Sequence, residues 1–172
     1  MSSNLKLGGW GVCWLIVFLL VLIWSGIAPY DYPTWILEVS PALIGLIILV
    51  ATRRVFPLTP LLYVLILIHS VILMVGGHYT YAEVPAFDAL SELLGWERNN
   101  YDKLAHFAQG FVPAIIAREI LVRNHVVRGR GWLFFVVVAI CLAFSAFYEL
   151  IEWWVAVLYG CLLYTSPSPR DA

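Results

Sequence analysis

Charged residues are scarce in this sequence, and their scarcity excludes most soluble folds. Only 12% of the 172 residues are Asp, Glu, Lys or Arg, whereas 62% are hydrophobic. A soluble domain cannot bury so large a share of apolar side chains, because its surface needs polar groups. The composition therefore predicts a protein whose main partner is the lipid bilayer.

Basic clusters and closely spaced cysteines are also lacking. Lys and Arg total 10 and Asp and Glu total 11, so the net charge is −1, and no basic patch stands out. A nucleic-acid-binding protein needs such a patch to neutralise phosphates, so we expect no nucleic-acid partner. The cysteines, Cys13, Cys141 and Cys161, are too far apart to form a metal-binding motif.

Long apolar runs make up most of the remaining sequence. A run of about 20 apolar residues crosses the hydrocarbon core of a bilayer as one helix. Five such runs follow one another, at about residues 10–28, 35–51, 58–76, 103–122 and 132–157. They predict an all-α, polytopic transmembrane bundle that forms one helical domain, residues 1–160.

The last residues have a different character. Residues 161–172, CLLYTSPSPRDA, are similar to the translation of an adapter used to prepare DNA sequencing libraries. We interpret this segment as a non-native tail, which has to be left out of fold reasoning. On this interpretation the natural protein continues after residue 160, where we expect a sixth span. The alternative is a genuine polar C-terminus.

Loop charges predict the orientation in the membrane. The loops after the second and fourth runs are basic, whereas the two loops at 29–34 and 77–102 are mainly acidic. Because basic loops remain in the cytoplasm, we predict a cytoplasmic N-terminus and place both acidic loops outside. The arginines that decide this are Arg53, Arg54, Arg123, Arg128 and Arg130.

The acidic loop 77–102 contains a short amphipathic segment. Phe87, Leu90 and Leu94 share one face of a helix formed by residues 85–94. A short helix on the outer membrane surface fits this pattern, and an ordinary ordered loop is the alternative.

Ionisable residues gather at the predicted outer ends of the spans. Each helical residue advances about 1.5 Å, which places Asp102 and His106 near the start of the fourth span. The same reasoning places Glu149 and Glu152 near the end of the fifth. Ionisable groups in lipid are costly and usually serve a function. We therefore predict Asp102, His106, Glu149 and Glu152 as candidate catalytic residues.

Several kinds of site are open for these residues. They could form a structural hydrogen-bonded network, or act as general acid and base on an envelope lipid or lipid-linked substrate. They could also bind a divalent metal such as Zn²⁺ through His78, His106 and Glu149, although the spacing matches no metal-binding motif. A small transporter or proton-coupled carrier is a further alternative, but only His69 lies near the middle of a span. A homodimer could complete so small a bundle.

Three stretches carry a resemblance to a known family. They are GGHYTYAEVP (76–85), NNYDKLAHFAQGFVPA (99–114) and FYELIEWW (147–154). Through them the chain resembles the YjdF-type family of bacterial inner-membrane proteins, which has no established function. The resemblance covers residues 4–160 and implies a small multi-pass bundle in the bacterial inner membrane. The segment Asp102–Phe107 is also similar, less specifically, to VanZ-like membrane proteins, which are associated with glycopeptide tolerance.

Overall fold

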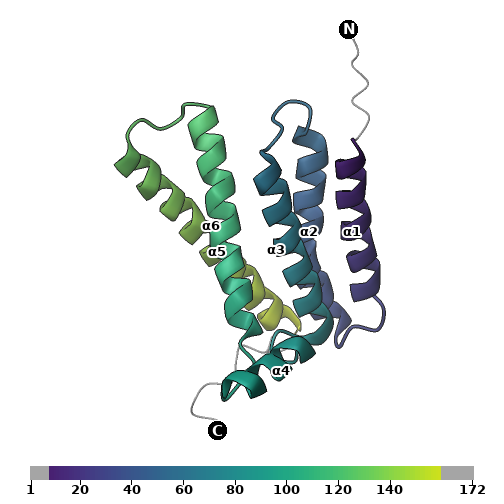
Figure 1. Cartoon of the computed structure of the whole chain (residues 1–172). Helices are drawn as coiled ribbons and strands as arrows, with labels where there is room; N and C mark the ends of the chain where they lie inside the picture. Colours follow the sequence, from purple (N-terminus) through teal and green to yellow (C-terminus); the bar gives the residue numbers. More distant parts are fainter. Residues whose placement is uncertain (1–7, 160–172) are drawn as a thin grey trace. The chain divides into compact units, whose positions relative to one another are not determined.

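The described part of the chain, residues 8–159 of a computed structural model, consists of six helices and contains no strand (Figure 1). The all-α prediction is therefore confirmed. The chain divides into two units, Met1–Ala105 and His106–Ala172, and each is described by itself. The adapter-like tail, residues 161–172, lies outside the described residues.

Each of the five predicted spans corresponds to a helix, and the amphipathic segment forms a sixth. The helices are α1 (Gly9–Ser25), α2 (Tyr32–Thr52), α3 (Pro60–Tyr79), α4 (Pro85–Leu94), α5 (Tyr101–Arg123) and α6 (Arg130–Tyr159). Four of them, α2, α3, α5 and α6, are long and apolar enough to cross a membrane. The remaining apolar helix, α1, has 17 residues.

The first helix is shorter than the sequence predicts, because it ends at Ser25 rather than near residue 28. Gly26 follows as the C-terminal cap, and Ala28 adopts a φ of 50°. Ala28 also precedes Pro29, and the residue before a proline is disfavoured in a helix. The apolar run therefore continues past the end of the helix.

Proline and a capping carboxylate set the helix starts. Pro60 and Pro85 are the first residues of α3 and α4, where a helix does not need the missing N–H. In α2, Pro33 lies in the first turn and Asp31 is the N-cap. Asp31 Oδ2 accepts hydrogen bonds from the Thr34 hydroxyl at 2.7 Å and from the Thr34 backbone N–H at 2.9 Å.

The Asp31 cap predicts a pH-dependent contribution to stability. The two Thr34 hydrogen bonds hold the pKa of Asp31 below its ordinary value, the hydroxyl bond contributing most. A depressed folded-state pKa stabilises the protein at neutral pH, and this contribution is lost as the pH falls below about 4. Asp31→Ala should lower the free energy of unfolding by about 1 kcal/mol at pH 7 and by less at pH 3.

Thermal unfolding of both proteins in detergent at the two pH values measures this difference. Asp31→Asn is the matched control, because asparagine can cap the helix but cannot be protonated in this range. A penalty for Asp31→Ala that is equal at pH 7 and pH 3 would contradict the prediction.

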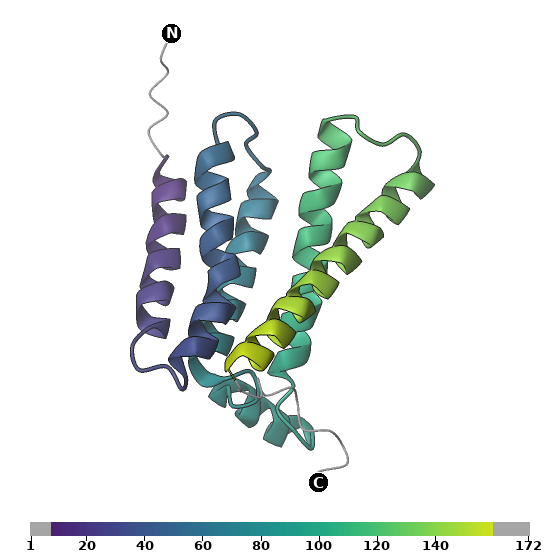
Figure 2. The same ribbon diagram turned by 180° about the vertical axis from the view of Figure 1, so that it is seen from behind.

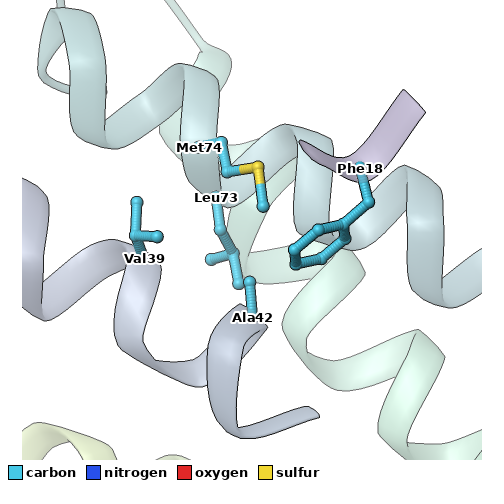
Figure 3. Packing of buried hydrophobic residues seen from close by; sticks show 5 residues of the cluster. All are labelled: Phe18, Val39, Ala42, Leu73 and Met74. Carbon is cyan, nitrogen blue, oxygen red and sulfur yellow. The ribbon is translucent and has the colours of Figure 1, made fainter. Parts of the chain in front are cut away.

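In the first unit, α3 packs against both α1 and α2, and the three helices lie side by side (Figure 1). Buried residues from all three form the core between them: Phe18, Val39, Ala42, Leu73 and Met74 (Figure 3). The end of α1, the start of α2 and the end of α3 consequently meet at one end of this unit, where α4 also lies.

In the second unit, residues 106–123 of α5 and the whole of α6 form an antiparallel helical hairpin (Figure 2). The chain reverses between them through residues with positive φ, His125 at 54° and Gly129 at 88°. The helices meet where Cys141 Sγ lies 3.7 Å from the carbonyl oxygen of Gly110. The N-terminal part of α5 and the C-terminal part of α6 therefore lie at the same end of this unit.

Candidate functional site

A group of polar side chains lies at the end of the first unit where α1 and α3 end and α2 begins. We call it the unit 1 polar cluster, and its members are Ser25, Trp35, Glu38, His78 and Tyr81. Ser25 is completely buried, and its hydroxyl donates to the carbonyl of Leu22 at 3.0 Å. The indole Nε1 of Trp35 donates to the same hydroxyl at 3.2 Å, which ties α2 to α1.

His78 joins the end of α3 to the end of α1. Its Nδ1 lies 3.0 Å from the carbonyl oxygen of Ser25. A carbonyl can only accept, so Nδ1 carries the proton and, in the neutral ring, Nε2 presents a lone pair. The ring is also packed against Trp24 and Tyr79, with centroids 4.6 Å away in each case. A fixed ring with one available nitrogen suits a general base, a hydrogen-bond acceptor or a metal ligand.

Glu38 and Tyr81 form the second connection of the cluster. Glu38 is half-buried on α2 and lies about 9 Å along the helix from its first residue. The hydroxyl of Tyr81 donates to Glu38 Oε2 at 2.6 Å. Tyr81 can reach back because Thr80, directly after α3, adopts a φ of 61° and turns the chain. A carboxylate within an apolar helix therefore has a hydroxyl partner held by a tight turn.

Two buried glycines near the end of α3 make room for this connection. A Cβ on Gly76 would collide with the Tyr81 ring, reaching Cε1 and lying 2.6 Å from Cζ. A Cβ on Gly77 would lie 3.1 Å from Glu38 Cβ. Glycine at position 76 therefore leaves room for the Tyr81 ring, whose hydroxyl donates to the Glu38 carboxylate.

A corner between α4 and α5 lies beside the cluster in the first unit. The Asn99 amide donates to the Val84 carbonyl at 2.9 Å and to Asp88 Oδ1 at 2.8 Å. The buried Ser91 hydroxyl donates to the carbonyl of Arg98 at 2.9 Å. These bonds hold the start of α5 against α4.

Asp102, a predicted catalytic residue, has a basic partner. Its Oδ2 lies 3.2 Å from Arg98 Nη2, and the Arg98 side chain is about half exposed. An exposed ion pair of this kind contributes only about 0–1 kcal/mol to stability. Asp102 is therefore a partly exposed carboxylate at the start of α5, next to a guanidinium that could help to bind an anionic group.

The other predicted catalytic residues lie in the second unit. His106 is exposed on α5, Glu149 is exposed on α6, and Glu152 is half-buried on α6. His106 lies near the start of α5, and Glu149 and Glu152 lie in the C-terminal half of α6, so the antiparallel hairpin places all three toward the same end of the unit. The expected approach of His106 to the two glutamates, and of all three to Asp102, stays a prediction.

Metal binding requires several ligands close together. Within residues 8–159, no group of three His, Cys, Asp or Glu side chains is placed to hold a metal ion. The predicted set is divided between the units, with His78 in the first and His106 and Glu149 in the second. A zinc ion held by these three residues stays a prediction.

Sequence reasoning identified some members of the cluster and missed others. His78 was singled out by its place at the end of a span. The roles of Ser25, Trp35 and Tyr81 were missed, since serine and aromatic residues are common at the ends of membrane helices. The pair of glycines before His78 was the available signal, because adjacent glycines in a helix often mark a close approach.

Sequence comparison assigns the chain to a family. The model of a family described as "Predicted membrane protein (DUF2238)" matches residues 11–172. The chain belongs to this family. The curated Inner membrane protein YjdF of Escherichia coli (strain K12) is 57% identical over 141 residues, which are 82% of this chain and 68% of that protein. No solved structure matches the chain.

Membership of the DUF2238 family confirms the resemblance and the class of protein. The relative is an inner-membrane protein, and the apolar helices of this chain are those of a multi-pass membrane protein. The family match extends to residue 172, and the interpretation of residues 161–172 as an adapter stays a prediction. The comparisons identify no reaction, so the chemistry of the site has to be argued from its residues.

Proposed function

We propose that this member of the DUF2238 family binds the polar headgroup of an envelope lipid or lipid-linked molecule at the outward-facing ends of its spans. The observation that carries the proposal is the arrangement of His78. Its Nδ1 bonds to the Ser25 carbonyl, and the ring packs against Trp24 and Tyr79. Nε2 is thereby oriented as an acceptor or base at the membrane boundary, where a headgroup lies.

The Glu38 carboxylate supports the same proposal. A carboxylate placed inside a membrane helix is costly, and such groups usually belong to functional sites. Glu38 is half-buried and bonded to Tyr81 in a turn that two glycines accommodate. A carboxylate and an imidazole on neighbouring helices can bind a headgroup that carries hydroxyl or ammonium groups.

The predicted acid–base residues would carry out any proton transfer to or from the bound headgroup. Asp102, His106, Glu149 and Glu152 include both carboxylates and an imidazole, the groups that most often transfer protons in enzymes. Their places near the start of α5 and the end of α6 support a common level in the membrane. In this form the protein is a membrane enzyme acting on an envelope lipid or lipid-linked substrate.

The proposal includes an orientation. Basic residues lie in the loop after α2, at the opposite end of the first unit from the unit 1 polar cluster, and in the loop after α5. Positively charged loops favour the cytoplasm, which directs the cluster to the outer face of the inner membrane and leaves the N-terminus in the cytoplasm.

Lipids that co-purify with the protein test the headgroup proposal. The wild-type protein should enrich one headgroup class relative to the bulk membrane. His78→Asn keeps an N–H for the Ser25 carbonyl and removes Nε2, so enrichment should fall about tenfold if one charged hydrogen bond is lost. His125→Asn, at an exposed position between α5 and α6, is the matched control and should behave as wild type.

Two outcomes would count against the proposal. One is a bound-lipid composition equal to that of the bulk membrane, and the other is undiminished enrichment by a folded His78→Asn protein. Total lipid extracts of cells with and without the gene then distinguish binding from catalysis. A change in the enriched class indicates conversion of the headgroup.

A further inference from the structure

The apolar arc of α4 is wider than the face that packs against the protein. Phe87 lies on the packed side, where its ring meets Tyr101 edge-on at a centroid distance of 5.0 Å. Leu93, about 120° round the helix from Phe87, is 81% exposed, and Leu94, on the face of Phe87 but about two turns farther along, is 51% exposed. Trp96, just after the helix, is 44% exposed. The sequence grouped Phe87 with Leu94 on one face, but only Phe87 is used in packing.

The opposite side of α4 is polar and acidic. Asp88 and Glu92 are exposed, and Asp88 accepts the hydrogen bond from Asn99. The helix contains no basic residue. α4 therefore has three sides: one packed on the protein, one acidic, and one apolar and exposed.

The packed side fixes the level of α4 relative to the membrane-spanning helices of its own unit. The Tyr101 hydroxyl donates to the carbonyl of Ile72 at 2.9 Å. Ile72 lies about 10 Å before Tyr79, the last residue of α3, along the helix axis. Phe87 thus rests on a side chain that reaches into the spanning part of α3. In a membrane that α3 spans, these contacts would hold α4 at the boundary between hydrocarbon and water.

We propose that Leu93, Leu94 and Trp96 insert into the lipid leaflet at this boundary, so that α4 is an interfacial helix anchored in the bilayer. The exposed apolar side belongs to a helix that Tyr101 connects to the C-terminal part of α3. Trp96 ends the segment with a side chain that favours the headgroup region. Because the polar side is acidic, insertion should rest on apolar burial and not on attraction to anionic lipids.

Fluorescence quenching in vesicles tests this insertion. Cys13, Cys141 and Cys161 are first replaced by serine. A single cysteine is then placed by Leu93→Cys or, as the matched control, by Glu92→Cys. Each protein is labelled with a polarity-sensitive fluorophore and reconstituted into phosphatidylcholine vesicles, with or without bromine on the acyl chains.

The label at position 93 should be quenched by brominated acyl chains and shielded from iodide present on both sides of the membrane. The label at position 92 should be quenched by iodide, because the acidic side of α4 faces water. Replacing part of the phosphatidylcholine by phosphatidylglycerol should not increase quenching at position 93.

Two results would overturn the proposal. If iodide reaches position 93 as readily as position 92, the apolar side faces water. If position 93 is shielded from both iodide and bromine, another part of the protein or a second copy covers it.

Discussion

Replacing Phe18 by alanine should lower the free energy of unfolding by about 3 kcal/mol, the largest stability effect predicted for this protein. Phe18 is completely buried between α1, α2 and α3, and its ring stacks on Trp14 at 5.5 Å (Figure 3). Lipid tails are as apolar as the core, so helix association depends on close packing. Alanine would leave a cavity that the packed helices cannot fill.

Equilibrium unfolding in mixed micelles of a mild detergent and dodecyl sulfate measures this loss. Leu20→Ala is the matched control on the same helix, because Leu20 is 62% exposed. Its removal should change stability by no more than about 0.5 kcal/mol. Equal losses for the two variants would contradict the packing described for this unit.

Gly76→Ala should lower stability by about 1–3 kcal/mol, although alanine is the better helix former. The new Cβ collides with the Tyr81 ring, whose hydroxyl is held by Glu38. The ring has to swing away, and a hydrogen bond to a charged group, worth about 1.5–3 kcal/mol, is then broken.

Two comparisons isolate the cause. Gly45→Ala in α2 adds a methyl group with nothing within 4 Å, so it should be neutral or stabilising. In a Tyr81→Ala background, Gly76→Ala should also be neutral or stabilising, because the obstructing ring is absent. If Gly76→Ala is as destabilising without Tyr81 as with it, the close approach is not the reason for the glycine.

The membrane-spanning helices could be predicted from the sequence, because a helix that crosses the bilayer core needs an apolar run of about 20 residues. The predicted short helix also begins at Pro85, the first residue of α4 in the structure. The end of α1 was less accurate, because the apolar run 10–28 continues past Gly26 while the helix does not. Apolar composition indicates which residues can contact lipid, whereas backbone conformation decides where a helix ends.

The candidate site was only partly predictable, because depth along a helix follows from residue number but rotation about its axis does not. Depth placed His78 at the end of its span, yet its bond to the Ser25 carbonyl depends on the packing of α3 against α1. The Glu38–Tyr81 bond likewise depends on the turn at Thr80. A positive φ at a threonine has no signal in the sequence.

For the amphipathic segment, too, the sequence predicted the helix but not the contacts that its residues make. Periodicity correctly predicted a helix over residues 85–94. It could not say which residues of the apolar face pack on protein, because Phe87 and Leu94 lie on that face about two turns apart and both are apolar. The structure shows that Phe87 contacts Tyr101, whereas Leu94 is 51% exposed.

The most direct test of the proposed outward-facing polar site is the accessibility of the two kinds of loop in intact cells. In a protein without its native cysteines, Glu83→Cys lies just after α3 near the polar cluster, and Arg128→Cys lies between α5 and α6. Both positions are exposed. A membrane-impermeant thiol reagent should label position 83 in intact cells, and position 128 only after the membrane is permeabilised. Labelling of position 128 but not of position 83 in intact cells would reverse the topology and place the cluster in the cytoplasm.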